Sequence, residues 1–204
     1  MSGLKKRFED TIKYLDREEW NKLQKAAQRS SPRDHLITQM LYDSGMRVGE
    51  LCTTRLEDID FENRFIRIQS FRSKTKRART ARLSKGTLDL IRGYIGNRRD
   101  GYIFESRGKH LSTRRIEQLI LKLAESSGIQ SICGSGKDGK KLRKVTPHTL
   151  RHTHIVHALM RHVPLNAVQA QVGHADIRTT QIYAGLAPEQ VRAAYDGFEM
   201  RCDQ

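Results

Sequence analysis

Two arginines and a histidine in this sequence have the types and spacing needed to act on an anionic ester. Arg47 follows a glycine-containing turn signal, and Arg151 lies three positions after His148. A guanidinium group stays charged at every working pH, and its planar fork can hold two phosphate oxygens at once. A spacing of three places His148 and Arg151 on one helix face. These residues are therefore suited to neutralising the nonbridging oxygens of a phosphodiester during its cleavage.

Helix-start signals would position both arginines. A Ser-Gly pair at 44–45 should end one helix, so that Arg47 stands at the start of the next, where unpaired backbone N–H groups favour anions. A Thr-Pro pair is typical of a helix start and predicts a helix over residues 147–161. Arg151 would then lie within the first turns of that helix.

The remaining pattern predicts a mostly α-helical α+β domain with a small antiparallel sheet near residues 58 to 104. Alternating apolar residues predict a hairpin within residues 58–83, and its basic connection, residues 72–79, should project into solvent or onto a phosphate backbone. Residues 128–144, rich in Gly and Lys, should form a basic loop. Cap residues and apolar spacing predict further helices over residues 17–28, 32–44, 84–95, 112–123, 164–172, 176–183 and after Pro188.

The charge of the chain points to a polyanionic partner. Lys and Arg total 38 against 23 Asp and Glu, which gives a net charge of +15 in 204 residues. Nucleic acid is favoured over a surface that is basic merely for solubility, although charge does not separate a binding protein from an enzyme. RNA is disfavoured because no aromatic-rich stacking motif occurs. We expect no membrane segment, since apolar runs are short, and we place the protein in the cytoplasm, associated with the nucleoid.

No metal or other cofactor is predicted. The widely spaced cysteines form neither a disulfide framework nor a metal knuckle; they are Cys52, Cys133 and Cys202. Histidines are dense between positions 148 and 157, but they lack an HExxH pattern and a thiolate partner. Packing or surface positions are the better interpretation of three of them, His152, His154 and His157.

Five short motifs follow one another along the chain. They are Gly45-Met46-Arg47-Val48-Gly49-Glu50-Leu51, Ser73-Lys74-Thr75, Thr146-Pro147-His148-Thr149-Leu150-Arg151-His152, Gly173-His174 and Tyr183-Ala184. In this order and at these separations they resemble the motifs of the tyrosine recombinases, the phage integrase family. The resemblance covers residues 14–183, and the joint occurrence of the motifs is far more specific than any one of them. It implies the catalytic-domain fold of that family.

The resemblance also implies a site-specific recombination reaction through a 3′-phosphotyrosine intermediate, independent of metal and ATP. Tyr183 would attack the phosphate, and Lys74 would protonate the leaving 5′ oxygen. Lys76 remains an alternative acid because it would share a strand face with Lys74. Arg47 and Arg151 would clamp the phosphate. His148 and His174 would add hydrogen bonds to its oxygens, and Glu50 would support the site.

Double-stranded DNA is the expected partner, with self-association, as a tetramer on DNA, and accessory DNA-bending proteins. Further cations expected to bind DNA are Arg72, Lys76, Arg77, Arg79, Lys140, Lys141, Arg143 and Lys144. We expect a basic N-terminal segment over residues 1–13, a catalytic domain over 14–186 and a C-terminal helix over 187–204 that packs on a neighbouring protomer. Most family members carry an additional N-terminal helical domain, so the chain is either an excised fragment or similar to the small fimbrial-switch invertases.

Two alternatives stay open. The first is a nonenzymatic DNA-binding or regulatory protein that has the same fold. The second is an activity like that of the type IB topoisomerases, which relax supercoiled DNA without paired sites.

Overall fold

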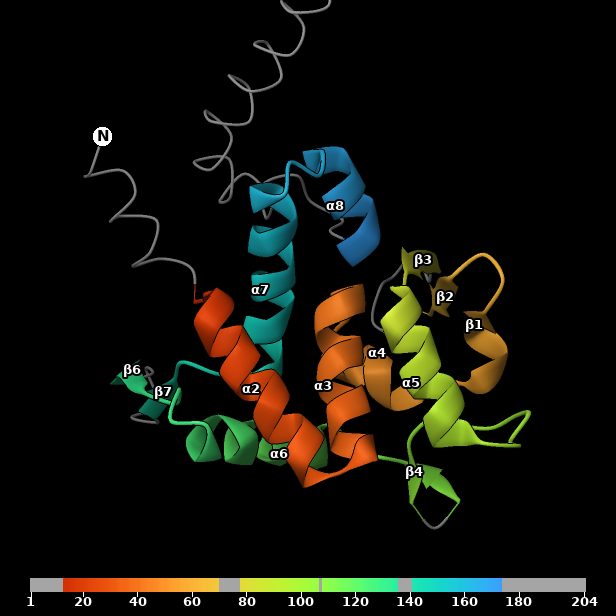
Figure 1. The fold of residues 1–204 in the computed structure, drawn as a ribbon, viewed down its shortest axis with the longest axis horizontal. Helices are drawn as coiled ribbons and strands as arrows, with labels where there is room; N and C mark the ends of the chain where they lie inside the picture. The colour runs from red at the N-terminus through yellow and green to blue at the C-terminus, as the bar shows by residue number, and fades with distance from the viewer. Residues whose placement is uncertain (1–12, 70–77, 107, 136–140, 174–204) are drawn as a thin grey trace, which may run out of the picture.

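The structure is a computed structural model that describes residues 13–69, 78–106, 108–135 and 141–173. It confirms the predicted mostly helical α+β fold with small antiparallel sheets (Figure 1). The helix predicted over 176–183 and the C-terminal helix lie outside the described residues. None of the helices within the described ranges is long and apolar enough to cross a membrane.

Most of the described helices lie around one central helix. The helices are α2 (Arg17–Ser30), α3 (Pro32–Ser44), α4 (Val48–Thr53), η1 (Leu56–Asp58), α5 (Lys85–Ile95), α6 (Thr113–Ser126), α7 (Pro147–Met160) and α8 (Leu165–Val172). The strands are β1 (Ile59–Asp60), β2 (Phe65–Ile68), β3 (Arg79–Arg82), β4 (Glu105–Ser106), β5 (Lys109–His110), β6 (Ile132–Ser135) and β7 (Lys141–Arg143).

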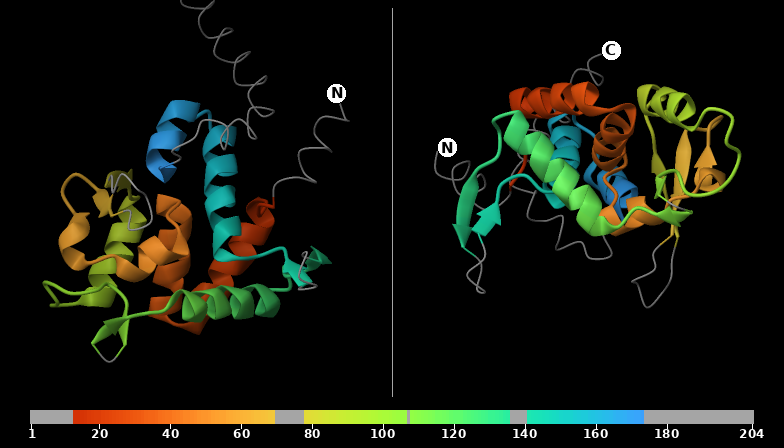
Figure 2. Two further views of the ribbon diagram at one scale, coloured as in Figure 1. Left: turned by 180° about the vertical axis from the view of Figure 1, so that it is seen from behind. Right: turned by 90° about the horizontal axis from the view of Figure 1, so that it is seen from below.

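Helix α3 is the central element. It contacts α2, α4, α5, α6 and α7, which surround it in Figures 1 and 2. Its buried residues lie on more than one face, a pattern typical of a helix enclosed by others. Its start is set by Ser31, whose side chain accepts the backbone N–H of Asp34, and by Pro32 in the first turn. The helix predicted over residues 32–44 is therefore confirmed.

The predicted hairpin is confirmed, and a third strand extends it. Strands β1, β2 and β3 form an antiparallel sheet in that order, with Ile66 opposite Ala81. Along β2 the side chains alternate between exposed and buried, so Ile66 and Ile68 face the core. The sheet lies beside α5, at the opposite side of the molecule from α2 (Figure 1).

The prediction of a loop over residues 128–144 is wrong. Residues Ile132–Ser135 and Lys141–Arg143 pair as the antiparallel hairpin β6–β7, with an irregular register. Backbone pairing holds this hairpin, whereas its apolar side chains Ile132 and Leu142 are exposed. A strand whose side chains bury little surface has no period-two burial pattern to reveal it in the sequence.

Helix α7 joins two groups of buried side chains. Leu150 belongs to the main core, which includes most of the buried residues of α3 and α6. One turn later, Ile155, Val156 and Leu159 form a second cluster with Val168 and Val172 of α8. The second cluster fixes α8 on α7, and through α7 its position depends on the main core.

Candidate active site

The turn between α3 and α4 anchors the candidate site. Gly45 ends α3 in the left-handed conformation, with φ of 61°. A Cβ atom on Gly45 would lie 2.7 Å from Cγ1 of Val172 and 3.1 Å from Cδ2 of His154. Glycine is thus required by the backbone conformation and by the space that α7 and α8 leave.

We expect Gly45→Ala to lower the free energy of unfolding by about 2–4 kcal/mol, from left-handed strain and overpacking against Val172. Urea denaturation measures the change. Gly86→Ala is the matched control, because nothing lies within 4 Å of its added methyl group, and alanine in a helix is favoured over glycine by up to about 1 kcal/mol. Equal stability of the two variants would contradict the packing described here.

Arg151 is held at this turn. The α7 helix begins at a capping pair, in which Thr149 and Thr146 exchange side-chain to backbone hydrogen bonds. His148 and Arg151 therefore lie within the first turns of α7, as predicted. Arg151 is 2% exposed, and its Nη1 donates to the carbonyl of Gly45 at 2.6 Å. This bond joins α7 to the turn two residues before Arg47.

Arg47 is the N-cap residue of α4 and is hydrogen-bonded to Glu50. The carboxylate of Glu50 accepts the backbone N–H of Arg47 at 2.8 Å and its Nη1 at 3.3 Å. The side chain of Arg47 is 52% exposed, whereas that of Glu50 is 9% exposed. Arg47 can therefore reach a ligand outside the protein while Glu50 holds its backbone from inside.

His148 completes the group. The pKa of His148 lies below its ordinary value because burial removes water and because the positive charges of Arg151 and Arg47 disfavour a further proton. Its ring also packs edge-on against His152, with 4.3 Å between ring centroids. The structure therefore brings Arg47 and Arg151 near His148, and burial together with the two positive charges favours the neutral form of its imidazole.

We expect the pKa of His148 to rise in Arg47→Ala, because one repelling charge is lost. The pH titration of the His148 ring protons by NMR measures the shift, with His148→Gln to assign the signal. Arg92→Ala is the control, since Arg92 pairs with Asp89 on another helix. An unchanged titration in Arg47→Ala would mean that the two side chains are not neighbours in solution.

Arg79 has a different environment from the one predicted. We expected it in an exposed loop, but it is the first residue of β3 and its side chain is 14% exposed. Its Nη1 and Nη2 donate to the two carboxylate oxygens of Glu50, each at 2.9 Å. No local pattern indicates this pair, because the partners are 29 positions apart and belong to different elements.

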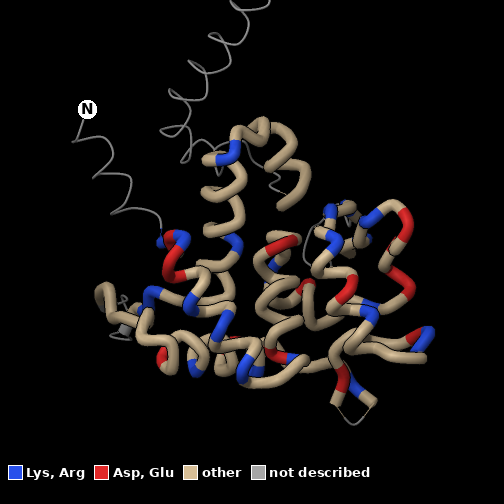
Figure 3. The backbone as a smooth tube through the Cα atoms, viewed as in Figure 1, with Lys and Arg blue, Asp and Glu red and all other residues tan. Residues whose placement is uncertain are grey.

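The other described cations expected to bind DNA lie around the β6–β7 hairpin. Arg143 pairs with Glu125 at 2.9 Å, with both side chains about half exposed. Lys144 pairs with Glu19 of α2 and is 29% exposed. Figure 3 shows Lys and Arg spread over most elements with acidic residues between them. The remaining predicted residues lie outside the described residues, or have no described side chain; they are Arg72, Lys74, Lys76, Arg77, Lys140, Lys141, His174 and Tyr183.

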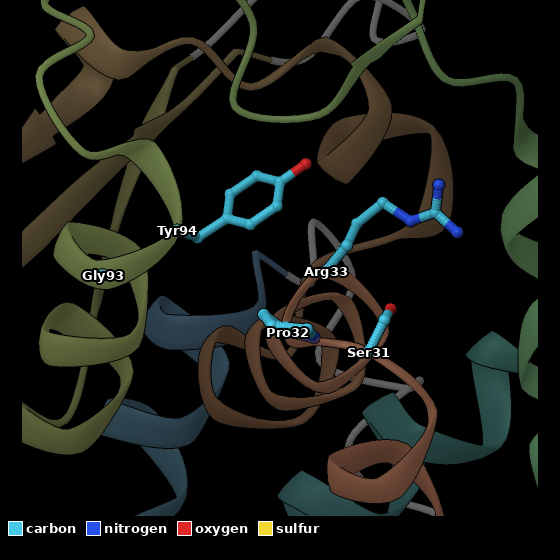
Figure 4. Close-up of a pocket in the computed structure, with 5 residues that line it drawn as sticks. All are labelled: Ser31, Pro32, Arg33, Gly93 and Tyr94. Carbon is cyan, nitrogen blue, oxygen red and sulfur yellow. The ribbon is translucent and has the colours of Figure 1, made fainter.

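A shallow depression elsewhere on the molecule does not belong to this site. It lies between the start of α3 and the end of α5 (Figure 4) and is lined by Ser31, Pro32, Arg33, Gly93 and Tyr94. The 13 residues of α3 separate it from Gly45, a length of about 20 Å. Within the described part of the chain, no group of three or more His, Cys, Asp and Glu side chains is placed to hold a metal ion.

Comparisons with known proteins identify the fold and the family. The fold is that of the tyrosine recombinase catalytic domains. It is similar to the catalytic domain of bacteriophage HP1 integrase, with a TM-score of 0.66, 20% identity, and coverage of 91% of this chain and 94% of that one. It is also similar to the XerH site-specific recombinase bound to its difH substrate, with a TM-score of 0.64, 21% identity, and coverage of 84% and 50%.

The sequence comparison identifies the family. The model of the phage integrase family matches residues 13–190, and the chain belongs to that family. It is 33% identical over 190 residues to the tyrosine recombinase XerA of Pyrococcus furiosus, which covers 90% of this chain and 61% of the relative. The chain thus spans about three fifths of the length of this relative.

Proposed function

We propose that this chain is the catalytic part of a site-specific recombinase that cleaves and rejoins double-stranded DNA. One observation carries the proposal: Arg151 donates to the carbonyl of Gly45, two residues before Arg47, and the pKa of His148 is lowered by the charges of both arginines. Two guanidinium groups beside a neutral imidazole form a site for a phosphodiester. Membership of the phage integrase family supports DNA as the source of that phosphodiester.

In the proposed reaction Arg47 and Arg151 bind the nonbridging oxygens of the scissile phosphate. The Tyr183 hydroxyl attacks phosphorus, and the bond to the 5′ oxygen of the next nucleotide breaks. A tyrosine hydroxyl has an ordinary pKa of about 10, so it needs a proton acceptor at neutral pH. Burial and the two arginine charges favour the unprotonated imidazole of His148, whose ring nitrogen can accept that proton. Lys74 gives a proton to the departing 5′ oxygen, with Lys76 as the alternative donor.

The product of this step is a 3′-phosphotyrosine ester and a free 5′ hydroxyl. Attack by a 5′ hydroxyl from a second strand re-forms the DNA ester and breaks the phosphotyrosine bond. The proton of that hydroxyl passes to Lys74, and His148 returns its proton to the Tyr183 oxygen. Because the phosphotyrosine ester retains the energy of the DNA ester that was broken, the cycle needs no ATP. His174 would add a hydrogen bond to the phosphate, and Glu50 would hold Arg47 through the bonds described above.

The wider assembly is part of the proposal. Residues 14–186 would form the catalytic unit, preceded by a basic segment, residues 1–13, and followed by a helix, residues 187–204, that packs on a neighbouring protomer. A tetramer on DNA is then the active species, and accessory DNA-bending proteins assist it. Exposed cations such as Arg143 would supply contacts to the DNA backbone beyond the site.

Covalent capture tests the proposed function. The protein is incubated with nicked genomic DNA fragments, which trap a cleaving enzyme because the short strand beyond the nick diffuses away. We expect a denaturant-resistant protein–DNA complex that is lost in Tyr183→Phe, and sequencing of the captured ends then gives the target. Binding without any covalent complex would favour the nonenzymatic alternative. Relaxation of supercoiled plasmid without paired sites would favour the topoisomerase-like alternative.

A further inference from the structure

Arg79 is the residue whose surroundings the proposed reaction leaves unexplained. It donates three hydrogen bonds to groups of the protein, two to Glu50 and one from Nε to the carbonyl of Gln171 at 3.3 Å. The carboxylate beside it offsets its charge, and only 14% of the side chain is exposed. A cation that served as a contact to the DNA backbone would instead present its donors to solvent.

We propose that Arg79 is a positioning residue that fixes Arg47 and the end of α8 relative to each other, a role that rests on the proposed function. The first half of this link runs through Glu50. Each carboxylate oxygen of Glu50 accepts one bond from Arg79 and one from Arg47, at distances between 2.8 and 3.3 Å. The planar fork of Arg79 therefore sets the plane of the carboxylate that holds Arg47.

The second half of the link runs through Gly173, the residue before His174 in the sequence. Gly173 has φ of 66° and ends α8. A Cβ atom on it would lie 2.4 Å from Cδ, 2.6 Å from Nε and 3.0 Å from Cζ of Arg79. The Arg79 side chain thus lies directly against the Gly173 backbone. Gln171 adds to this contact, because its side chain accepts the backbone N–H of Arg82 at 2.8 Å.

Electrostatics favour the same role. Burial raises the pKa of Glu50, but the hydrogen bonds and charges of Arg79, and then those of Arg47, more than offset it, so that the pKa lies below its ordinary value. Without Arg79, burial would act against the carboxylate with one arginine fewer to oppose it. Glu50 would then take up a proton at a higher pH and hold Arg47 less firmly.

The first test uses random-sequence duplex DNA as the probe and compares Arg79→Met with Arg82→Met. Both variants remove one cation from β3, but the guanidinium of Arg82 lies over the ring of Phe65, away from Glu50. We expect Arg79→Met to bind with an unchanged salt dependence. A salt slope reduced by about one would identify Arg79 as a phosphate contact and overturn the proposal.

The second test measures hydrogen exchange in the protein without DNA. The backbone N–H of Arg47 donates to Glu50, and that of Gly173 donates to the carbonyl of Gln169. We expect exchange at both positions to be faster in Arg79→Met and unchanged in Arg82→Met. Unchanged exchange in Arg79→Met would overturn the proposal even if the protein cleaves DNA, so this readout is independent of the proposed function.

The third test uses nicked duplexes of the captured target sequence. We expect covalent complex formation to fall about 10- to 100-fold in Arg79→Met, with the acid limb of its pH profile moved to higher pH. The fall in rate caused by Arg79→Met should be smaller in a Glu50→Gln background, because both substitutions break the same link between Arg79 and Arg47.

Arg79→Lys is the conservative control. It keeps the charge, so it should retain part of the cleavage rate, which would show that the loss in Arg79→Met does not come from misfolding. Additive losses with an unmoved pH profile would overturn the proposal. A wild-type protein without covalent complex would instead count against the proposed function.

Discussion

Replacement of Arg47 by alanine is expected to slow covalent complex formation by about 100- to 1000-fold, the loss typical when one donor to a developing charge is removed. The side chain is 52% exposed, so its removal should leave the folded state nearly as stable as before. Affinity for nonspecific DNA should fall only slightly, because that affinity is a sum over many phosphate contacts. Nicked-substrate kinetics and binding curves at several salt concentrations measure the two effects separately.

Arg92→Ala is the matched control for that experiment. Arg92 is 54% exposed and pairs with an acidic residue three positions away, as Arg47 does, but it lies on α5. Loss of one surface charge is the same in both variants, so only a catalytic contribution separates them. Equal cleavage rates for the two variants would show that Arg47 does not bind the scissile phosphate.

Replacement of Arg151 by lysine is expected to produce two losses at once. Lysine keeps the charge but lacks the planar fork, so covalent complex formation should again fall by about 100- to 1000-fold. The carbonyl of Gly45 also loses its bond from Nη1 in a buried place, which should cost about 1–3 kcal/mol of stability. Urea denaturation and nicked-substrate kinetics, run where the variant is fully folded, measure the two losses.

Measured together, activity and stability distinguish the role of Arg151 from that of Arg47. Arg47→Ala should lose activity with little change in stability, whereas Arg151→Lys should lose both, since only Arg151 is buried. A folded Arg151→Lys protein that cleaves at the wild-type rate would show that bidentate phosphate binding by Arg151 is not needed.

Local signals in the sequence were sufficient for most elements that carry the site. The Ser-Gly end of α3 and the Thr-Pro start of α7 act within one turn, and the structure contains both. The left-handed Gly45 follows the same logic. Such signals are readable because they need no knowledge of the rest of the fold.

Long-range relationships were not readable in the same way. The pairing of Glu50 with Arg79 depends on how β3 lies relative to α4. Both residues were singled out from the sequence, but their pairing was not predicted. The hairpin β6–β7 was missed because its strands bury little and Gly and Lys dominate the segment between them. The convergence of Arg47 and Arg151 was expected from the family resemblance, whereas the bond that produces it, to the Gly45 carbonyl, became visible only in the structure.

The close packing of Gly45 links the anchor of Arg151 to the seating of α8. Val172 of α8 and His154 of α7 both touch the place where a side chain on Gly45 would stand. Withdrawal of α8 would open a gap beside this turn and also pull Gly173 away from Arg79. The turn that anchors Arg151 and the last described helix are therefore coupled through Gly45, so a change in the position of α8 would reach the Gly45 carbonyl and Arg79 together.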